Sequence, residues 1–227
     1  MENEKDIVVV TGASYGIGKA TAKMLAENGY HVVAIARDSD QLETIKSEDI
    51  EVHTVDITNV DQVYGFCQKL VGRNVVALVN NAGGGFNLPN SILDDDIQNW
   101  NKSFDLNVVG AANLTKQIAP IMITNGGGNV VLVTSMAGHF VYRGGSSYTV
   151  AKHAEVALAE ILRFELFQSN IRVTEIAPGN VNSRGDRDPG NSLNAEDVAE
   201  AIRWSIMAPK HVNIEKLSIL HINNLSR

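Results

Sequence analysis

Three side chains in one short stretch of the sequence have the types and the spacing to move a proton. Tyr148 and Lys152 are four residues apart, so on a helix they lie on the same face, one turn from each other. A phenol is a poor acid, with an unperturbed pKa of about 10, and a neighbouring ammonium group favours its ionised form. The hydroxyl of Ser135 can donate a hydrogen bond to a carbonyl oxygen and stabilise the charge that grows there. Together the three predict acid–base chemistry at a carbonyl group.

The elements on either side favour a functional interpretation of a spacing that also occurs by chance. An apolar run at 129–134 predicts a buried strand that ends next to Ser135, and a helical pattern runs from Tyr148 to Gln168. In open α/β sheets, site residues lie where the strands end. We therefore interpret the three residues as parts of a site and not as ordinary helix residues.

The N-terminal part of the chain shows a strand, a glycine-rich turn and a helix in that order. The apolar run 6–11 is typical of a strand covered on both faces, and helical spacing follows at 19–28. Between them, Gly12, Gly16 and Gly18 give the pattern G-x-x-x-G-x-G. Glycines let the backbone approach a pyrophosphate, which the positive end of a helix attracts. This context predicts a dinucleotide site.

A cation and then a carboxylate follow the second strand, expected at 31–36. An acidic residue at this place binds the ribose hydroxyls of NAD, whereas an arginine accommodates the 2′-phosphate of NADP. Here Arg37 comes first and Asp38 follows, and Asp38 can turn toward Arg37 or toward solvent. We expect NADP as the cofactor in preference to NAD.

Strand and helix patterns alternate along the rest of the chain. Strands are expected at 50–55, 75–79, 171–176 and 217–222, and helices at 41–47, 59–71, 94–123 and 195–207. Asn107 lies inside the third of these helices among apolar neighbours, which suggests a hydrogen-bonding role. The polar segment 181–193, with glycine and proline, suggests a lid. We predict a single α/β domain over 1–227, a Rossmann-type doubly wound parallel sheet of about seven strands flanked by helices.

Composition excludes several classes of partner. With 227 residues and a net charge of −7 but no basic run, the chain is unlike proteins that bind nucleic acid or an anionic membrane. No apolar run reaches the roughly 18 residues that span a bilayer. The acidic start MENEKD shows no signal peptide, so we expect a cytoplasmic protein.

Cysteine and histidine give no sign of a disulfide or a metal site. The single cysteine, Cys67, falls in an amphipathic helical pattern and is expected to be buried. The six histidines show no metal-binding spacing. His139 and Arg143, between Ser135 and Tyr148, either face a substrate carboxylate or are solvated loop residues.

Taken together, the motifs resemble the short-chain dehydrogenase/reductase family. They are Thr11-Gly12-x-x-x-Gly16-x-Gly18, Asp56, Asn80-Asn81-Ala82-Gly83, Asn107, Ser135, Tyr148-x-x-x-Lys152 and Pro178-Gly179, in the family's order between about residue 6 and residue 183. Segments at 177–181, 209–214 and 217–219 are further similar to NADP-dependent 3-hydroxy acid dehydrogenases and carbonyl reductases.

The resemblance implies a role for each site residue. Tyr148 would donate and accept the proton, Lys152 would also bond the nicotinamide ribose, Ser135 would orient the substrate oxygen, and Asn107 would hold a water in a proton relay. The implied cofactor contacts are Gly12, Ser14, Gly16, Ile17 and Gly18 at the pyrophosphate and adenosine side, Arg37 at the 2′-phosphate, Asp56 and Ile57 at adenine, Asn80, Ala82 and Gly83 at the adenosine ribose and nearby backbone, Pro178, Gly179 and Val181 at the nicotinamide pocket, and Ser183, where the family usually has threonine, at the nicotinamide amide.

The implied reaction is hydride transfer between NADP and a small ketone, aldehyde or secondary alcohol, which includes hydroxy acids. The short polar lid disfavours a large apolar substrate. Two alternatives stay open: a related enzyme that acts on another bond, such as an enoyl reductase, and a non-enzymatic dinucleotide sensor or scaffold. The helices after Asp105 and Tyr148 carry more apolar surface than one sheet covers, so we expect a homo-oligomer, a tetramer or dimer.

Overall fold

A parallel sheet forms the centre of the molecule, and the computed structural model describes it through residues 5–86, 91–185 and 187–224. The acidic start at 1–4 and the last three residues of the chain lie outside the described residues. Within those residues the sheet has seven strands in the order β3-β2-β1-β4-β5-β6-β7. The strands are β1 (Ile7–Thr11), β2 (His31–Ala36), β3 (Ile50–Thr54), β4 (Val75–Asn80), β5 (Gly128–Val133), β6 (Ile171–Pro178) and β7 (Lys216–Ile219).

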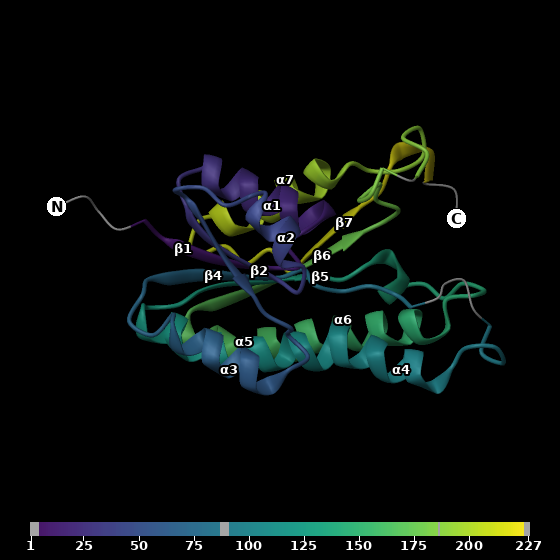
Figure 1. Ribbon diagram of the computed structural model, residues 1–227, viewed down its shortest axis with the longest axis horizontal. Helices are drawn as coiled ribbons and strands as arrows, with labels where there is room; N and C mark the ends of the chain where they lie inside the picture. Colours follow the sequence, from purple (N-terminus) through teal and green to yellow (C-terminus); the bar gives the residue numbers. More distant parts are fainter. Residues whose placement is uncertain (1–4, 87–90, 186, 225–227) are drawn as a thin grey trace.

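Helices cover both faces of this sheet, as Figure 1 shows. On one face lie α1 (Gly16–Glu27), α2 (Ser39–Glu43) and α7 (Ala195–Met207). On the other lie α3 (Val60–Gln68), α4 (Ile97–Phe104), α5 (Gly110–Thr124) and α6 (Ser146–Leu166). The predicted single-domain, doubly wound Rossmann-type fold is confirmed. No helix in the part of the chain that the structure describes has both the length and the apolar character needed to cross a bilayer.

The alternation of side chains along each strand produces two hydrophobic cores, one under each helix layer. In β1, Ile7 and Val9 belong to one core, and Val8 and Val10 belong to the other. Because successive side chains point to opposite faces, a strand covered on both sides must be apolar throughout. This is why the first strand reads as an unbroken apolar run.

The strand order reverses between β1 and β4, which lie side by side although β2 and β3 separate them in the chain. In doubly wound sheets, ligands bind outside the carboxyl ends of the strands at such a switch point. Both the glycine-rich loop after β1 and the loop after β4 start there. The topology therefore brings two of the sequence motifs together.

The helical stretch predicted at 94–123 is confirmed from Ile97 to Thr124, but a π-helical turn that the sequence did not predict lies within it. A π-helical turn, η1 (Asp105–Val109), separates α4 from α5. A π turn inserts one residue into the helical repeat, and apolar periodicity does not reveal it. Asn107 lies in this turn, fully buried.

Other boundaries differ from the prediction by a few residues. The helix expected at 41–47 is α2 (Ser39–Glu43), which starts earlier because the Asp38 side chain accepts a hydrogen bond from the backbone nitrogen of Gln41 and caps it. The last strand ends at Ile219 instead of 222. Helix α7 spans 195–207 as predicted, and Asn194 and Asp197 form a reciprocal capping box at its start.

Candidate active site

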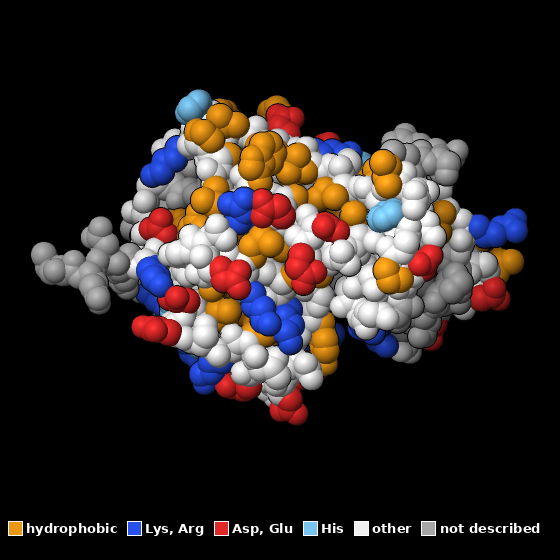
Figure 2. Space-filling model, turned by 90° about the horizontal axis from the view of Figure 1, so that it is seen from above, with side chains coloured by type: hydrophobic (Ala, Val, Ile, Leu, Met, Phe, Trp, Pro, Cys, Tyr) orange, Lys and Arg blue, Asp and Glu red, His pale blue; other side chains and the backbone are white. Residues whose placement is uncertain are grey.

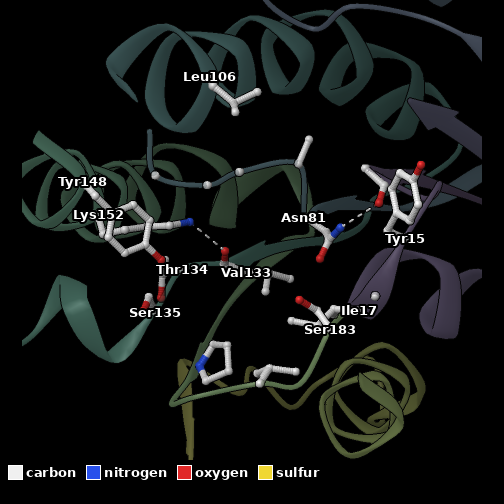
Figure 3. A pocket seen from close by; sticks show the side chains of 18 of the residues that line it. Tyr15, Ile17, Asn81, Leu106, Val133, Thr134, Ser135, Tyr148, Lys152 and Ser183 are labelled. Atoms are coloured by element: carbon white, nitrogen blue, oxygen red, sulfur yellow. Dashed lines mark hydrogen bonds between the residues drawn. The ribbon is translucent and has the colours of Figure 1, made fainter. Parts of the chain in front are cut away.

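A cavity of about 1260 Å³ opens at the carboxyl ends of the strands. The loops after β1, β2, β3, β4, β5 and β6 and the start of α6 surround it. Figure 3 shows ten labelled residues of its lining from close by. Among the predicted site residues, those that line it are Gly12, Ser14, Gly16, Ile17, Arg37, Asp56, Ile57, Ala82, Gly83, Ser135, Tyr148, Lys152, Pro178, Gly179, Val181 and Ser183. The other three, Gly18, Asn80 and Asn107, are buried outside the lining.

The glycine-rich loop is shaped so that only glycine fits. Gly12 and Gly16 adopt φ angles of +65° and +49°, in the left-handed region. A Cβ on Gly12 would lie 2.9 Å from the Cα of Ala82 in the neighbouring loop, and one on Gly18 would lie 2.3 Å from the carbonyl oxygen of Gly12. Gly18 therefore does not face the cavity. Its lack of a side chain lets the first turn of α1 pack against the backbone of Gly12.

Helix α1 begins at this loop, and no side chain caps its N-terminus. Its first turn also lacks acidic residues. The backbone N–H groups of such a turn, together with the positive end of the helix dipole, attract an anion. The cavity, the close-packed glycines and the uncapped helix thus fit the pyrophosphate of a dinucleotide.

Asn81 holds the two loops together, a role that sequence reasoning did not assign. Its Nδ2 donates to the carbonyl oxygen of Thr11 at 2.8 Å, and the Thr11 hydroxyl accepts from the backbone nitrogens of Asn81 and Ala82 at 2.9 and 2.8 Å. Asn80 points away from the cavity, and its side chain donates to the Thr115 hydroxyl of α5 at 3.0 Å. Of the two adjacent asparagines, the second is the one that reaches the cavity.

The side chain of Asp38 is half-buried, so it is partly open to solvent, one of the two expected orientations, and it has a partner in Tyr15 that the sequence did not predict. It accepts a hydrogen bond from the Tyr15 hydroxyl at 2.7 Å and, through its other oxygen, caps α2. The Tyr15 hydroxyl lowers the pKa of the Asp38 carboxyl. Arg37 remains exposed at the edge of the cavity.

The serine, tyrosine and lysine converge on the opposite side of the cavity, as Figure 3 shows. Ser135 is the second residue after β5, and its hydroxyl accepts from the backbone nitrogen of Ala137 at 3.1 Å. Tyr148 lies in the first turn of α6, and the Nζ of Lys152 lies 6.0 Å from the centre of its ring. The prediction that the two side chains share a helix face is confirmed.

Lys152 is buried, and two acceptors fix its ammonium group. Its Nζ donates to the carbonyl oxygen of Val133 at 3.2 Å and to Oε2 of Glu155 at 2.6 Å. Burial alone disfavours the charged amine, but the carboxylate of Glu155 outweighs this effect and, with Tyr148, raises the pKa of Lys152. Sequence reasoning missed Glu155. An acid three residues after the lysine, on the apolar face of the helix, was the available signal.

Asn107 fixes the loop after β4 against the lysine. Its Nδ2 donates to the carbonyl oxygens of Ser103 and Gly84 at 2.7 and 3.0 Å, and its Oδ1 accepts from the backbone nitrogen of Gly84 at 3.0 Å. A Cβ added to Gly83 would lie 2.7 Å from this Oδ1 and 3.1 Å from Nζ of Lys152. The side chains of Asn107 and Lys152 leave no space for a side chain at position 83.

The segment that follows β6 also contributes to the cavity lining, through Val181, Ser183, Arg184 and Arg187. Val181 and Leu193 pair in a parallel bridge, which holds the two ends of the segment 181–193 together. Arg187 in this segment lines the cavity, and its guanidinium donates to Oδ1 of Asn180 at 3.2 Å. Burial raises the pKa of Tyr142, which also lines the cavity, and the charge of Arg187 opposes that shift.

Neither His139 nor Arg143 lines the cavity. His139 is not a solvated loop residue either, because its Nε2 lies 2.6 Å from Oε1 of the buried Glu175 on β6. Arg143 is exposed. Cys67 is buried as predicted, and burial raises the pKa of its thiol to about 12.

Comparison with known proteins agrees with this geometry. A family model described as short chain dehydrogenase matches residues 6–191. An uncharacterized oxidoreductase of Mycobacterium tuberculosis is 40% identical over 95% of this chain and 90% of its own length. Sulfoacetaldehyde reductase 2 of Chromohalobacter salexigens is 32% identical over 95% of this chain and 94% of its own. Among solved structures, the closed form of serine dehydrogenase complexed with NADP+ superposes with a TM-score of 0.90 at 26% identity, covering 96% of this chain and 95% of that one.

Proposed function

The chain belongs to the short-chain dehydrogenase family and is an NAD(P)-dependent oxidoreductase, and from this premise we propose that it transfers a hydride between NADP and a small carbonyl compound or secondary alcohol that carries an anionic group. The observation that carries the proposal is the convergence of Ser135, Tyr148 and Lys152 on one end of a cavity whose other end fits a dinucleotide. The segment 181–193 acts as the lid over the substrate.

The residues present fit the cofactor. The glycine-rich loop and the uncapped start of α1 would hold the pyrophosphate, Asp56 and Ile57 would hold the adenine, Ala82 and Gly83 would lie at the adenosine ribose, and Pro178, Gly179, Val181 and Ser183 would shape the nicotinamide pocket. When bound, the nicotinamide supplies or accepts the hydride. Asn80 and Gly18 support this site from outside the cavity lining.

The charges at the adenosine end support NADP over NAD. Arg37 is exposed at the edge of the cavity, and Arg184 is close enough to Tyr15 for its charge to act on the phenol. Asp38, the carboxylate that would bind ribose hydroxyls, is already engaged by Tyr15 and by the backbone of α2. Two cations and an occupied carboxylate favour a 2′-phosphate.

The acid–base chemistry belongs to the side chains at the other end. In the reductive direction Tyr148 donates a proton to the substrate oxygen, Ser135 donates a hydrogen bond to the same oxygen, and Lys152 supplies the positive charge beside the phenol. In the oxidative direction Tyr148 accepts the proton. The side chain of Asn107 is occupied by Ser103 and Gly84, and its role in holding a relay water stays a prediction.

Arg187 supports an anionic substrate. Among the described residues, the cavity-lining Lys152 is paired with Glu155, whereas the cavity-lining Arg187 donates to the neutral amide of Asn180. Sulfoacetaldehyde and serine, named for two of the similar proteins, both carry an acidic group. A guanidinium binds carboxylates and sulfonates well because its donors match their paired oxygens.

A spectrophotometric screen with NADPH and NADH tests the proposal. We expect turnover of small aldehydes and ketones with a carboxylate or sulfonate, and a lower kcat/KM for neutral analogues of the same size. Arg187→Gln should lower kcat/KM for the anionic substrate about tenfold or more, with little change for the neutral analogue. Arg143→Gln is the matched control, because that arginine lies outside the cavity.

Other outcomes would overturn specific parts of the proposal. Equal kcat/KM for charged and neutral analogues would refute the role of Arg187. Turnover of enoyl thioesters but not of ketones would identify an enzyme that acts on another bond. Binding of NADPH without turnover across the panel would identify a sensor or scaffold.

We also propose that the protein is a homo-oligomer, a tetramer or dimer. Large apolar side chains are exposed on the outer surface of the α4–α6 layer, for example Val109, Ile161 and Phe164, the last at 82%. On the opposite face, over α1, α2 and α7, charged and apolar side chains alternate (Figure 2). Sedimentation of a monomer at micromolar concentration would refute this proposal. The cytoplasmic location stays a prediction.

A further inference from the structure

The catalytic lysine shares its buried position with an acid that the proposed reaction does not use. Glu155 lies one turn after Lys152 on α6, is 1% exposed, and accepts from Nζ at 2.6 Å. A charged carboxylate at this depth is costly unless a cation is beside it. Its cation here is the same ammonium group that faces Tyr148.

A second buried carboxylate lies close by on β6. Oε1 of Glu175 accepts from the Thr134 hydroxyl at 2.7 Å and lies 2.6 Å from Nε2 of His139. On the other side of that ring, Nδ1 lies 3.1 Å from Nζ of the exposed Lys216 on β7. The negative charge of Glu175 acts on Glu155, whereas its own nearest partners are His139 and Thr134.

These surroundings make the charge of Glu155 sensitive to conditions near neutrality. Burial raises the pKa of the Glu155 carboxyl to about 7, Glu175 adds to this effect, and the ammonium of Lys152 opposes it. When Glu155 is ionised it offsets much of the positive charge of Lys152. When Glu155 is protonated, that charge acts on Tyr148 without compensation.

We propose that Glu155 is a positioning residue that orients the Lys152 ammonium from behind and sets how strongly it favours the ionised form of Tyr148. This inference rests on the proposed function, in which Tyr148 exchanges the proton. It differs from a purely structural role, in which Glu155 would only neutralise a buried lysine and would leave the ionisation of Tyr148 unchanged.

The expected shift in the ionisation of Tyr148 follows from its distance to Glu155 along α6. Glu155 is seven positions after Tyr148, which is about 10 Å along the helix axis. At an effective dielectric constant of about 20, a unit charge at that distance shifts an ionisation equilibrium by about one pH unit. A negative charge opposes formation of the phenolate, so its removal moves the transition to lower pH.

Glu155→Gln tests this inference, because it removes the charge and keeps the size of the side chain. In the holoenzyme, the pH–rate profile for alcohol oxidation should move by about one unit to lower pH. Glu160→Gln, an exposed acid on the same helix, is the matched control and should leave the profile in place. An unchanged profile in Glu155→Gln, or a shift to higher pH, would overturn the inference.

A second measurement needs neither cofactor nor turnover. Ultraviolet titration of tyrosinate in the free protein, with the Tyr148→Phe signal subtracted in each background, reports the ionisation of that one phenol. The same downward shift is expected in Glu155→Gln, and its absence would refute the inference. If Tyr148→Phe kept normal turnover, the proposed function would fail, while this titration would still test the influence of Glu155.

If Glu155→Gln does not fold, the inference can still be tested with Glu155→Asp and with the wild-type protein. Glu155→Asp keeps the charge and should keep the midpoint of the wild-type profile, to within about 0.3 unit. A midpoint displaced by a full unit would show that length and not charge matters. In the wild-type protein, an infrared band of a buried protonated carboxyl should disappear between about pH 6 and pH 8, and its absence would contradict the inference.

Discussion

The hydroxyl of Tyr15 donates a hydrogen bond to the carboxylate of Asp38 across 2.7 Å, at the edge of the cavity beside Arg37. This contact withdraws the carboxylate that would otherwise suit the ribose hydroxyls of NAD. We therefore expect the preference for NADP over NAD to depend on Arg37, on Arg184 and on the Tyr15 hydroxyl that engages Asp38.

The first prediction concerns Arg37. In Arg37→Ala the KM for NADPH should rise about tenfold or more, because a charge-assisted contact with the 2′-phosphate is lost. The KM for NADH should change little, since NADH lacks that phosphate, and NADH thus serves as the internal control. Steady-state kinetics with both cofactors would measure this. An equal loss for the two would place Arg37 away from the 2′-phosphate.

Gly83 and Gly84 form a matched pair for the second prediction. Gly83→Ala should lower kcat strongly, because its Cβ would lie 2.7 Å from Oδ1 of Asn107 and 3.1 Å from Nζ of Lys152. A Cβ on Gly84 would meet nothing within 4 Å, so Gly84→Ala should keep most of the activity. Kinetics and thermal unfolding of both variants would measure this, and equal effects would argue against close packing behind the lysine.

Tyr148 is the subject of the third prediction. Tyr148→Phe should lower kcat by about 10² to 10⁴, the usual contribution of general acid–base catalysis, while NADPH binding measured by fluorescence persists. Tyr64→Phe, an exposed tyrosine on α3, should behave as the wild type. Near-normal turnover in folded Tyr148→Phe would assign proton transfer to another group.

The fourth prediction concerns stability and pH at Glu51 on β3. Its carboxylate accepts from Arg73 at 2.8 Å and lies 2.5 Å from Nε2 of His53. Burial opposes ionisation, but Arg73 and His53, with His31, hold the pKa of Glu51 at about 2, below its ordinary value of 4.5. Its contribution to stability is therefore present above pH 4.5 and is lost as the pH falls toward 2.

Urea unfolding at several pH values would test this contribution. The free energy of unfolding should fall more steeply between about pH 5 and pH 3 in the wild type than in Glu51→Gln, which has no carboxylate to protonate. Parallel curves for the two proteins would show that the contacts of Glu51 add nothing to stability.

Sequence reasoning recovered what depends on spacing along one element. The Tyr148–Lys152 pair follows from the helical repeat, and the position of Ser135 follows from the end of a buried strand. The glycines of the first loop were found for the same reason, because strand, turn and helix are contiguous in the chain. The parallel sheet followed from the alternation of strand and helix patterns.

The features that could not be predicted from the sequence depend on contacts between distant parts of the chain. Asn81 reaches Thr11 only because β4 lies beside β1, and His139 meets Glu175 only because the loop after β5 lies over β6. The π turn at Asn107 changes the local register without changing composition. The partner of Asp38 could not be foreseen either, because Tyr15 reaches it from another loop.

The bridge between Val181 and Leu193 has a practical consequence. Because Val181 and Leu193 are paired, we expect that the segment we propose as the lid can be changed without moving its two ends. Replacing the residues that follow Arg184 in this segment should redirect the choice of substrate, whereas Ser183 and Arg184 must be kept for recognition of the dinucleotide.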